Sequence, residues 1–126
     1  WQVELVDTGP ETDTGGRITG LKEHLGDQFM LTYTDGLSDV PINDLVAFHN
    51  SHQGLVTMTT VPLRSQYGTV EFGPQGRVVE FLEKPLLRSH WINAGFFVLD
   101  REVFDHWEGS NFEKDVLPAL AAKGLV

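Results

Sequence analysis

The sequence contains no cysteine, which excludes both a disulfide-bonded scaffold and a cysteine-ligated zinc site. It has no apolar run near the roughly 18 residues of a transmembrane helix, and no basic segment followed by an apolar stretch that would mark a signal peptide. Cations are also few, since 9 Lys and Arg stand against 18 Asp and Glu and give a formal charge of −9. This balance argues against non-specific binding to nucleic acid or to an anionic membrane, but it allows a phosphate ligand held by a few local cations.

The composition is that of an ordinary globular chain. Its 126 residues are 40% hydrophobic and 10% aromatic, which is enough apolar side chain for one core. We therefore expect a single domain, or most of one, over residues 1–126. The first residue is Trp1 and not Met, so we also expect a piece of a longer protein.

Strand and helix patterns alternate along the chain. The predicted strands are 2–6, 29–33, 55–61, 69–72, 77–81 and a last one that contains Trp91-Ile92 and 96–99. The predicted helices run from an N-cap among residues 12–14 to Leu25, then over 41–50, 103–107 and 112–123. Residues 73–76 join two strands as a hairpin turn. The order predicts an α/β fold with a mostly parallel, Rossmann-like sheet, helices on both faces and a β-hairpin. We expect the strands 29–33, 55–61 and 96–99 to be adjacent and buried, and the first to be buried on both faces, because their residues are almost all apolar.

Asp35 follows a short and almost wholly apolar predicted strand. Ligands of open α/β sheets bind outside the carboxyl ends of the strands, and a carboxylate there can hold Mg²⁺ over a phosphate. The competing interpretation is a simple turn, because Asp-Gly is a common turn pair.

Three other polar segments are candidates for ligand binding. Glu83-Lys84 precedes Pro85, which favours an extended Lys84, and the pair suits a ligand with both phosphate and hydroxyl groups; the alternative is an exposed ion pair. Asn93 can contact a sugar hydroxyl or serve only as a turn residue. Tyr67-Gly68 opens the hairpin, where the glycine permits a close ligand approach or merely a bulge.

Further patterns carry weaker signals. The Gly-bearing segment 9–17 matches no phosphate-loop pattern, so Arg17 is either a phosphate contact or a solvated helix residue. His49 and His52 are spaced as a zinc pair but have no obvious third ligand. Asp7-Thr8-Gly9 resembles the active-site turn of a dimeric aspartic protease, although Pro10 and the predicted helices do not suit that all-β fold.

Six ordered motifs together resemble one family, the sugar-1-phosphate nucleotidylyltransferases, over essentially the whole chain. They are VDTG with TGGRI, FMLTYTDG with SDV, DLVAFHNSH, YGTVEF, FLEKP and WINAGFFVLD. Within the family, the similarity is greatest to the cytidylyltransferases that act on glucose 1-phosphate. The resemblance implies a cytoplasmic enzyme in which glucose 1-phosphate attacks the α-phosphorus of CTP and pyrophosphate is released.

The resemblance also implies roles for individual residues. The implied catalytic residues are Asp35, which matches the family's Mg²⁺ ligand, and Lys84, which matches the lysine that binds the sugar phosphate. The implied substrate-binding residues are Tyr33, Tyr67, Gly68, Glu83, Lys84 and Asn93. Because these residues match one family site, we expect Asp35, Glu83, Lys84 and Asn93 to share a cleft.

The chain also departs from the family pattern. Thr34 and Ala94 stand where the family usually has glycine, and neither the N-terminal Gly-rich nucleotide loop nor the segment with a second metal-binding Asp is present. We therefore expect the chain by itself to be inactive, and we expect the incomplete sheet to favour self-association. The competing hypothesis is a non-catalytic module that binds sugar phosphates or serves in assembly.

Overall fold

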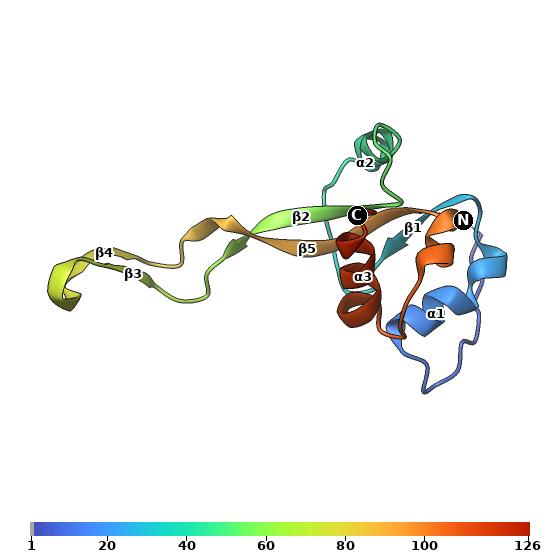
Figure 1. Cartoon of the computed structure of the whole chain (residues 1–126), viewed down its shortest axis with the longest axis horizontal. Helices are drawn as coiled ribbons and strands as arrows, with labels where there is room; N and C mark the ends of the chain where they lie inside the picture. The colour runs from blue at the N-terminus through green and yellow to red at the C-terminus, as the bar shows by residue number, and fades with distance from the viewer. Residues whose placement is uncertain (1) are drawn as a thin grey trace.

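The computed structural model describes residues 2–126 and contains a three-stranded sheet against which the helices pack (Figure 1). Its strands are β1 (Gln28–Thr32), β2 (Val56–Arg64) and β5 (Leu86–Asp100), in the spatial order β1-β5-β2. The predicted adjacency of these segments is confirmed, since Leu99 of β5 pairs with Phe29 on one side and with Val56 on the other.

The α/β class is confirmed, but the expected mostly parallel sheet is wrong for the described residues. β2 and β5 are joined through a hairpin, which makes neighbouring strands antiparallel, and β1 also runs antiparallel to β5. The apolar strands had favoured a parallel sheet because such strands are covered on both faces. Here the cover comes from α1 (Thr14–Gly20) and α3 (Leu117–Ala122) on one face and α2 (Ile42–His49) on the other (Figure 1).

The main core lies on the face of α1 and α3. Alternate side chains of the sheet, Phe29, Phe97, Leu99 and Val56, point toward this face. They pack there against the buried residues Ile18, Val103, Phe112, Val116 and Leu120. Each of these large apolar side chains contributes about 1.5–3 kcal/mol through removal from water.

The opposite face is covered less completely. Val98 is fully buried and Thr57 is 5% exposed, whereas Met30 of β1 remains 55% exposed. The helix α2 packs on β2 and β5, so β1 has little cover on this side. The expectation that the Phe29–Tyr33 segment is buried on both faces is therefore wrong for Met30.

The N-terminal segment differs from the sequence prediction. Residues 2–6 form no strand, because no other strand pairs with them. The predicted helix start is confirmed at Asp13, whose carboxylate accepts a hydrogen bond of 2.7 Å from the Thr14 N–H. The helix α1 ends at Gly20, and only a 3₁₀ turn, η1 (Lys22–His24), continues toward Leu25.

The C-terminal helical region is less regular than predicted. A 3₁₀ helix, η3 (Arg101–His106), replaces the expected short α-helix, and the long helix divides into a π turn, η4 (Phe112–Val116), followed by α3. Pro118 in the first turn of α3 has no N–H to donate, so α-helical bonding is interrupted there. Asn111 caps η4 by accepting from the N–H groups of Glu113 and Lys114.

The predicted hairpin is confirmed as β3 (Thr69–Phe72) and β4 (Val78–Leu82), joined by the 3₁₀ turn η2 (Pro74–Gly76). We call residues 65–85 the arm, because they project from the sheet away from the helices (Figure 1). Its strands expose the large apolar side chains Val70, Phe72, Val78, Val79, Phe81 and Leu82. None of the helices within residues 2–126 has the length and apolarity of a membrane span.

Candidate functional site

A cavity of about 420 Å³ opens where β1 ends. Tyr33, Thr34 and Asp35, which follow the last residue of β1, form one wall. Thr14 and Arg17 of α1 and Glu113 of η4 form another, over an apolar base of Ile18, Leu31 and Phe112. Two predicted site residues, Tyr33 and Asp35, therefore lie in one hollow beside a guanidinium and a second carboxylate.

Asn93 joins this site through Tyr33. Its Nδ2 donates to the Tyr33 hydroxyl at 2.8 Å, and its Oδ1 accepts from the Gly95 N–H at 2.7 Å. These bonds define which end of the amide faces the tyrosine. Asn93 is thus a part of the candidate site, and it lies within β5, so the alternative of a turn residue is wrong.

The environment of Tyr33 favours its protonated form. Partial burial, hydrogen bonding to Glu113 and the negative charge of Glu113 raise the pKa of Tyr33 to about 12, while the Asn93 bond opposes the shift. A phenol in this state keeps its proton at neutral pH. Tyr33 therefore acts here as a hydrogen-bonding residue, with no tendency to ionise.

Gly95 is required for this arrangement. Its φ is +78°, and a Cβ at this position would lie 2.5 Å from the Tyr33 ring. The backbone N–H of Tyr33 also donates to the Gly95 carbonyl at 3.2 Å. The glycine of the Asn-x-Gly motif thus lets the tyrosine ring lie directly against β5.

Asp35 lies in an exposed turn two residues after Tyr33. Within residues 2–126, no three His, Asp or Glu side chains gather into a metal-binding group. A magnesium ion does not require such a group, because it usually takes one or two protein carboxylates together with phosphates and water. The single carboxylate of Asp35 at the cavity rim fits that kind of ion.

Sequence reasoning missed the contribution of η4. Glu113 lies 80 positions after Tyr33 and belongs to a helical segment that was interpreted only as a core element, so no local signal marked it. Arg17 had been considered, and the structure gives it partners: its guanidinium donates to the Thr8 hydroxyl at 2.9 Å and to the Pro10 carbonyl at 3.3 Å. The side chain is held next to the cavity while remaining exposed.

Glu83 and Lys84 lie at the base of the arm. The Lys84 ammonium is 3.9 Å from a carboxylate oxygen of Glu83, and both side chains are exposed. Lys84 has a φ of +46°, so the extended conformation expected from the following Pro85 is wrong. Left-handed backbone at a non-glycine residue costs about 1–2 kcal/mol, and such strain is concentrated at functional sites.

Gly68, which follows Tyr67, packs against Phe81 and Glu83. A Cβ on Gly68 would come within 2.5 Å of the Phe81 ring and 3.2 Å of a Glu83 carboxylate oxygen. The Tyr67 side chain is 77% exposed. The close packing of Gly68 therefore explains the glycine without a ligand, while the neighbouring tyrosine remains available for contact.

The predicted residues form two groups in the described part of the chain. Tyr33, Asp35 and Asn93 lie at or behind the cavity, whereas Glu83 and Lys84 lie in the arm, just before the start of β5 at Leu86. Asn93 lies seven positions after Leu86 in β5, which corresponds to roughly 20 Å of extended strand. The cavity at the end of β1 is lined by Asp35 and not by Glu83, Lys84 or Asn93.

Both histidines of the predicted pair are close to the Thr57 hydroxyl. His49 is buried, and the Thr57 hydroxyl lies 2.8 Å from both His49 Nδ1 and His52 Nε2. The other nitrogen of His52 accepts from the Gly54 N–H at 2.9 Å. These contacts leave the imidazoles poorly placed for the zinc pair considered from their spacing.

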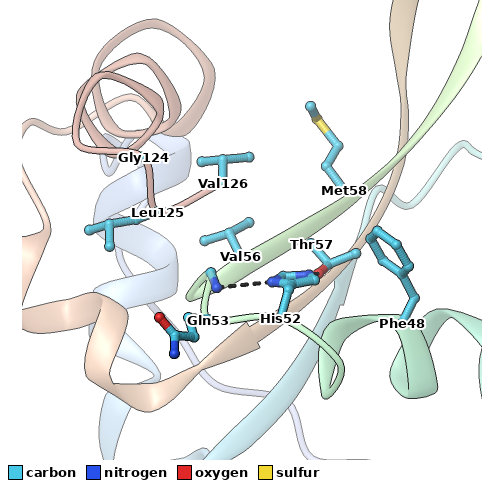
Figure 2. Close-up of a pocket in the computed structure, with 10 residues that line it drawn as sticks. Phe48, His52, Gln53, Val56, Thr57, Met58, Gly124, Leu125 and Val126 are labelled. Atoms are coloured by element: carbon cyan, nitrogen blue, oxygen red, sulfur yellow. Dashed lines mark hydrogen bonds between the residues drawn. The ribbon is translucent and has the colours of Figure 1, made fainter.

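A larger cavity, of about 720 Å³, lies beside His52 (Figure 2). Its walls come from Phe48, from the β2 residues Val56, Thr57 and Met58, and from the last residues of the chain, Gly124, Leu125 and Val126. This wall is mostly apolar and contains none of the predicted site residues. The smaller cavity at the end of β1 is therefore the better candidate for phosphate chemistry.

The aspartic protease hypothesis is wrong. Asp7 forms a local turn, in which its carboxylate accepts from the Gly9 N–H at 2.8 Å, and no strand precedes it within residues 2–6. The helices on both faces of the sheet are also incompatible with an all-β protease (Figure 1).

The comparison with protein families matches residues 7–125 to the nucleotidyl transferase family. The chain belongs to this family, whose match covers both groups of candidate residues. It is 36% identical to a glucose-1-phosphate cytidylyltransferase of Salmonella typhi and 37% identical to a probable glucose-1-phosphate cytidylyltransferase of Bacillus subtilis, in each case over 98% of this chain. The family expected from the six motifs is thereby confirmed.

Other relatives broaden the comparison. A mannose-1-phosphate guanylyltransferase catalytic subunit beta of Dictyostelium discoideum is 34% identical over 77% of this chain. The crystal structure of HddC from Yersinia pseudotuberculosis is similar in fold, with a TM-score of 0.59 at 19% identity, over 90% of this chain and 52% of that one. The chain spans about half the length of the cytidylyltransferases that it matches, 49% and 50% for the two bacterial proteins.

Proposed function

We propose that this chain is the sugar-binding central part of a single nucleotidyltransferase domain, in an enzyme that joins a nucleoside triphosphate to a hexose 1-phosphate. The observation that carries the proposal is the cavity at the end of β1, where Asp35, Arg17 and the Tyr33–Asn93 pair meet in a chain of this family. A carboxylate and a guanidinium beside hydrogen-bonding groups suit a ligand with phosphates and hydroxyls.

The proposed substrates are CTP and glucose 1-phosphate. Support comes from the two bacterial cytidylyltransferases, which align with 98% of the chain, compared with 76% to 94% for five guanylyltransferases. In the reaction, an oxygen of the sugar phosphate forms a bond to the α-phosphorus of CTP. The bond from that phosphorus to the bridging oxygen of the β-phosphate breaks, and pyrophosphate departs with the electron pair. The expected cytoplasmic location stays a prediction.

The residues of this chain act in the proposal by binding and orienting. Arg17 offers a cation to phosphate, Lys84 binds the sugar phosphate, and Glu83 accepts hydrogen bonds from sugar hydroxyls. Asn93 contacts the sugar, and Tyr67 and Gly68 line the sugar pocket. No side chain has to become a nucleophile, because the substrate phosphate supplies one, and catalysis rests on positioning and charge neutralisation.

Asp35 is the residue proposed to hold Mg²⁺. When bound, the ion neutralises the charge of the phosphates. Asp35 fits this task because its carboxylate is exposed at the cavity rim and the residue lies only two positions after Tyr33. Replacement of Asp35 by Asn keeps the shape of the side chain and removes its charge.

The proposal is tested by pyrophosphate release from the full-length enzyme with Mg²⁺ and matched substrate pairs. The kcat/KM is expected to be higher for CTP with glucose 1-phosphate than for GTP with mannose 1-phosphate. Preference for the second pair overturns the choice of substrates while leaving the reaction class. Absence of release with either pair, together with sugar-phosphate binding in calorimetry, favours the non-catalytic module.

The full-length enzyme also tests the role of Lys84. Because a hydrogen bond to a charged group contributes about 1.5–3 kcal/mol, Lys84→Ala is expected to weaken glucose 1-phosphate binding by about ten-fold to a hundred-fold. The affinity for CTP changes little. Calorimetry measures both affinities, and Arg88→Ala, which removes another exposed cation near the base of the arm, is the matched control. Equal effects of the two substitutions contradict the assignment.

A further inference from the structure

Lys84, the proposed phosphate-binding residue, has an unusual backbone conformation. Its φ of +46° lies in the left-handed region, which few residues other than glycine adopt. A residue before proline normally takes an extended conformation, so Pro85 works against this state. Strained backbone persists only where the surrounding structure holds it in place. Contacts with neighbouring residues must therefore hold Lys84 in its conformation.

The end of β2 supplies these contacts. Arg64, the last residue of β2, donates from guanidinium Nη1 to the Lys84 carbonyl at 3.4 Å. The next backbone N–H, that of Ser65, donates to the Pro85 carbonyl at 2.9 Å. Arg64 also pairs with Leu86 in the ladder between β2 and β5. Two consecutive carbonyls are thus bound by two consecutive residues of the facing strand, which fixes the direction of the peptide that follows Lys84.

The backbone of Lys84 determines where its ammonium lies. In an extended chain successive side chains point to opposite faces, so an extended Lys84 would direct its side chain away from that of Glu83. In the structure the Lys84 ammonium lies 3.9 Å from a Glu83 carboxylate oxygen. The left-handed conformation therefore places both side chains on one side of the chain, where they can contact the phosphate and the hydroxyls of one ligand.

Arg64 belongs to none of the six motifs, and within residues 2–126 it forms no ion pair. We propose that Arg64 is a positioning residue, which holds the Lys84 carbonyl and thereby directs the Lys84 ammonium toward the sugar phosphate. The inference rests on the proposed function and deepens it, since it adds a residue outside the motifs to the recognition of the sugar phosphate. Arg64 touches no substrate in this arrangement and acts through Lys84.

The first test needs no catalysis and uses nuclear magnetic resonance of the 126-residue chain. Arg64→Ala is expected to shift the Cα and amide resonances of Lys84 toward those of an extended residue. The control Arg88→Ala, which removes another exposed cation near the base of the arm, leaves them unchanged. The amides of Val70 and Phe81, which pair across the arm, show whether the arm remains formed. Unchanged Lys84 resonances in Arg64→Ala, or an arm that opens throughout, overturn the inference.

The second test measures the binding of glucose 1-phosphate to the full-length enzyme by calorimetry. Arg64→Ala is expected to weaken this affinity by about two- to ten-fold, the value of one hydrogen bond, with the CTP affinity nearly unchanged. In a Lys84→Ala background, Arg64→Ala is expected to cause no further loss, because Arg64 acts only through Lys84.

The double variant distinguishes positioning from direct contact. Additive losses would show that the Arg64 guanidinium binds phosphate itself, and they overturn the positioning role. An unchanged affinity in Arg64→Ala, or an equal loss of affinity for CTP, overturns it as well. Failure of the proposed function is recognised separately, by absent glucose 1-phosphate binding in the unsubstituted enzyme, because the Lys84 resonances of the first test depend on no ligand.

Discussion

At the scale of residues, two glycines provide a matched test of the site geometry. Gly95 and Gly76 both have a positive φ, of +78° and +75°. A Cβ at Gly95 would meet the Tyr33 ring, whereas a Cβ at Gly76 would meet nothing within 4 Å. Alanine substitutions at the two positions therefore separate the free-energy cost of a positive φ from the cost of displacing the Tyr33 ring.

We expect Gly76→Ala to lower the free energy of unfolding by about 1–2 kcal/mol, the penalty for a left-handed alanine. Gly95→Ala is expected to cost about 1–3 kcal/mol more, because the added methyl group overpacks the site. Urea unfolding measures both values. Equal losses for the two variants would show that the Tyr33 ring does not lie against Gly95.

Tyr33 also predicts how stability depends on pH. Its pKa rises from 10.0 to about 12 on folding, so the folded chain holds this proton more tightly. The resulting stabilisation is present in full below pH 10 and is lost as the pH rises from 10 toward 12. Urea unfolding across this range is expected to show a steeper loss for the unsubstituted chain than for Tyr33→Phe. Parallel curves would contradict the shift.

At the scale of elements, the arm is expected to have the lowest local stability. Within residues 2–126, the strands β3 and β4 pair only with each other, and Glu71 and Glu80 oppose each other across the ribbon. A two-stranded ribbon is marginal in water, and facing like charges weaken it further. Its exposed apolar side chains are consistent with the expected self-association, which stays a prediction.

Hydrogen exchange of the 126-residue chain tests this difference between elements. Amides of β3 and β4 are expected to exchange at nearly unprotected rates, because opening the arm breaks few buried contacts. Amides of Phe97, Val98 and Leu99, which lie in the buried part of β5, are expected to exchange at least roughly a hundred-fold more slowly. Strong protection throughout the arm at low protein concentration would show that another surface of the same chain covers it.

At the scale of the whole molecule, the separation of the two residue groups limits what the chain does alone. The cavity contains Asp35 and Arg17, but Glu83 and Lys84 lie at the base of the arm. Phosphoryl transfer requires these groups to act on adjoining substrates at the same time. The net charge of −9 also disfavours a free triphosphate.

We therefore expect no pyrophosphate release above background from the 126-residue chain with CTP, Mg²⁺ and glucose 1-phosphate. Loss of a single preorganised donor already lowers rates by about a hundred-fold or more, and here several groups fail to converge. The full-length enzyme under the same conditions is the positive control. Robust turnover by the 126-residue chain would contradict the separation of the two groups.

The sequence by itself determined the family, the α/β class, the hairpin and the adjacency of the three sheet strands. These features follow from local signals: six ordered motifs, short apolar runs, and a Gly-Pro-Gln-Gly turn between two strand patterns. The direction of the strands was not determined in this way, because cover by helices on both faces produces the same apolar pattern in parallel and antiparallel strands. Residues 2–6 show the same limit, since an apolar segment becomes a strand only where another strand pairs with it.

Only the tertiary structure decided which site residues meet. It brought Glu113 to Tyr33 across 80 positions of sequence, through packing of η4 beside the end of β1, and no local pattern encodes such a contact. It also separated Lys84 from Asp35, because β5 is one long strand that carries the arm away from the cavity (Figure 1). Motifs identify residue types and their order, whereas the distances between them depend on the length and direction of the strands that carry them.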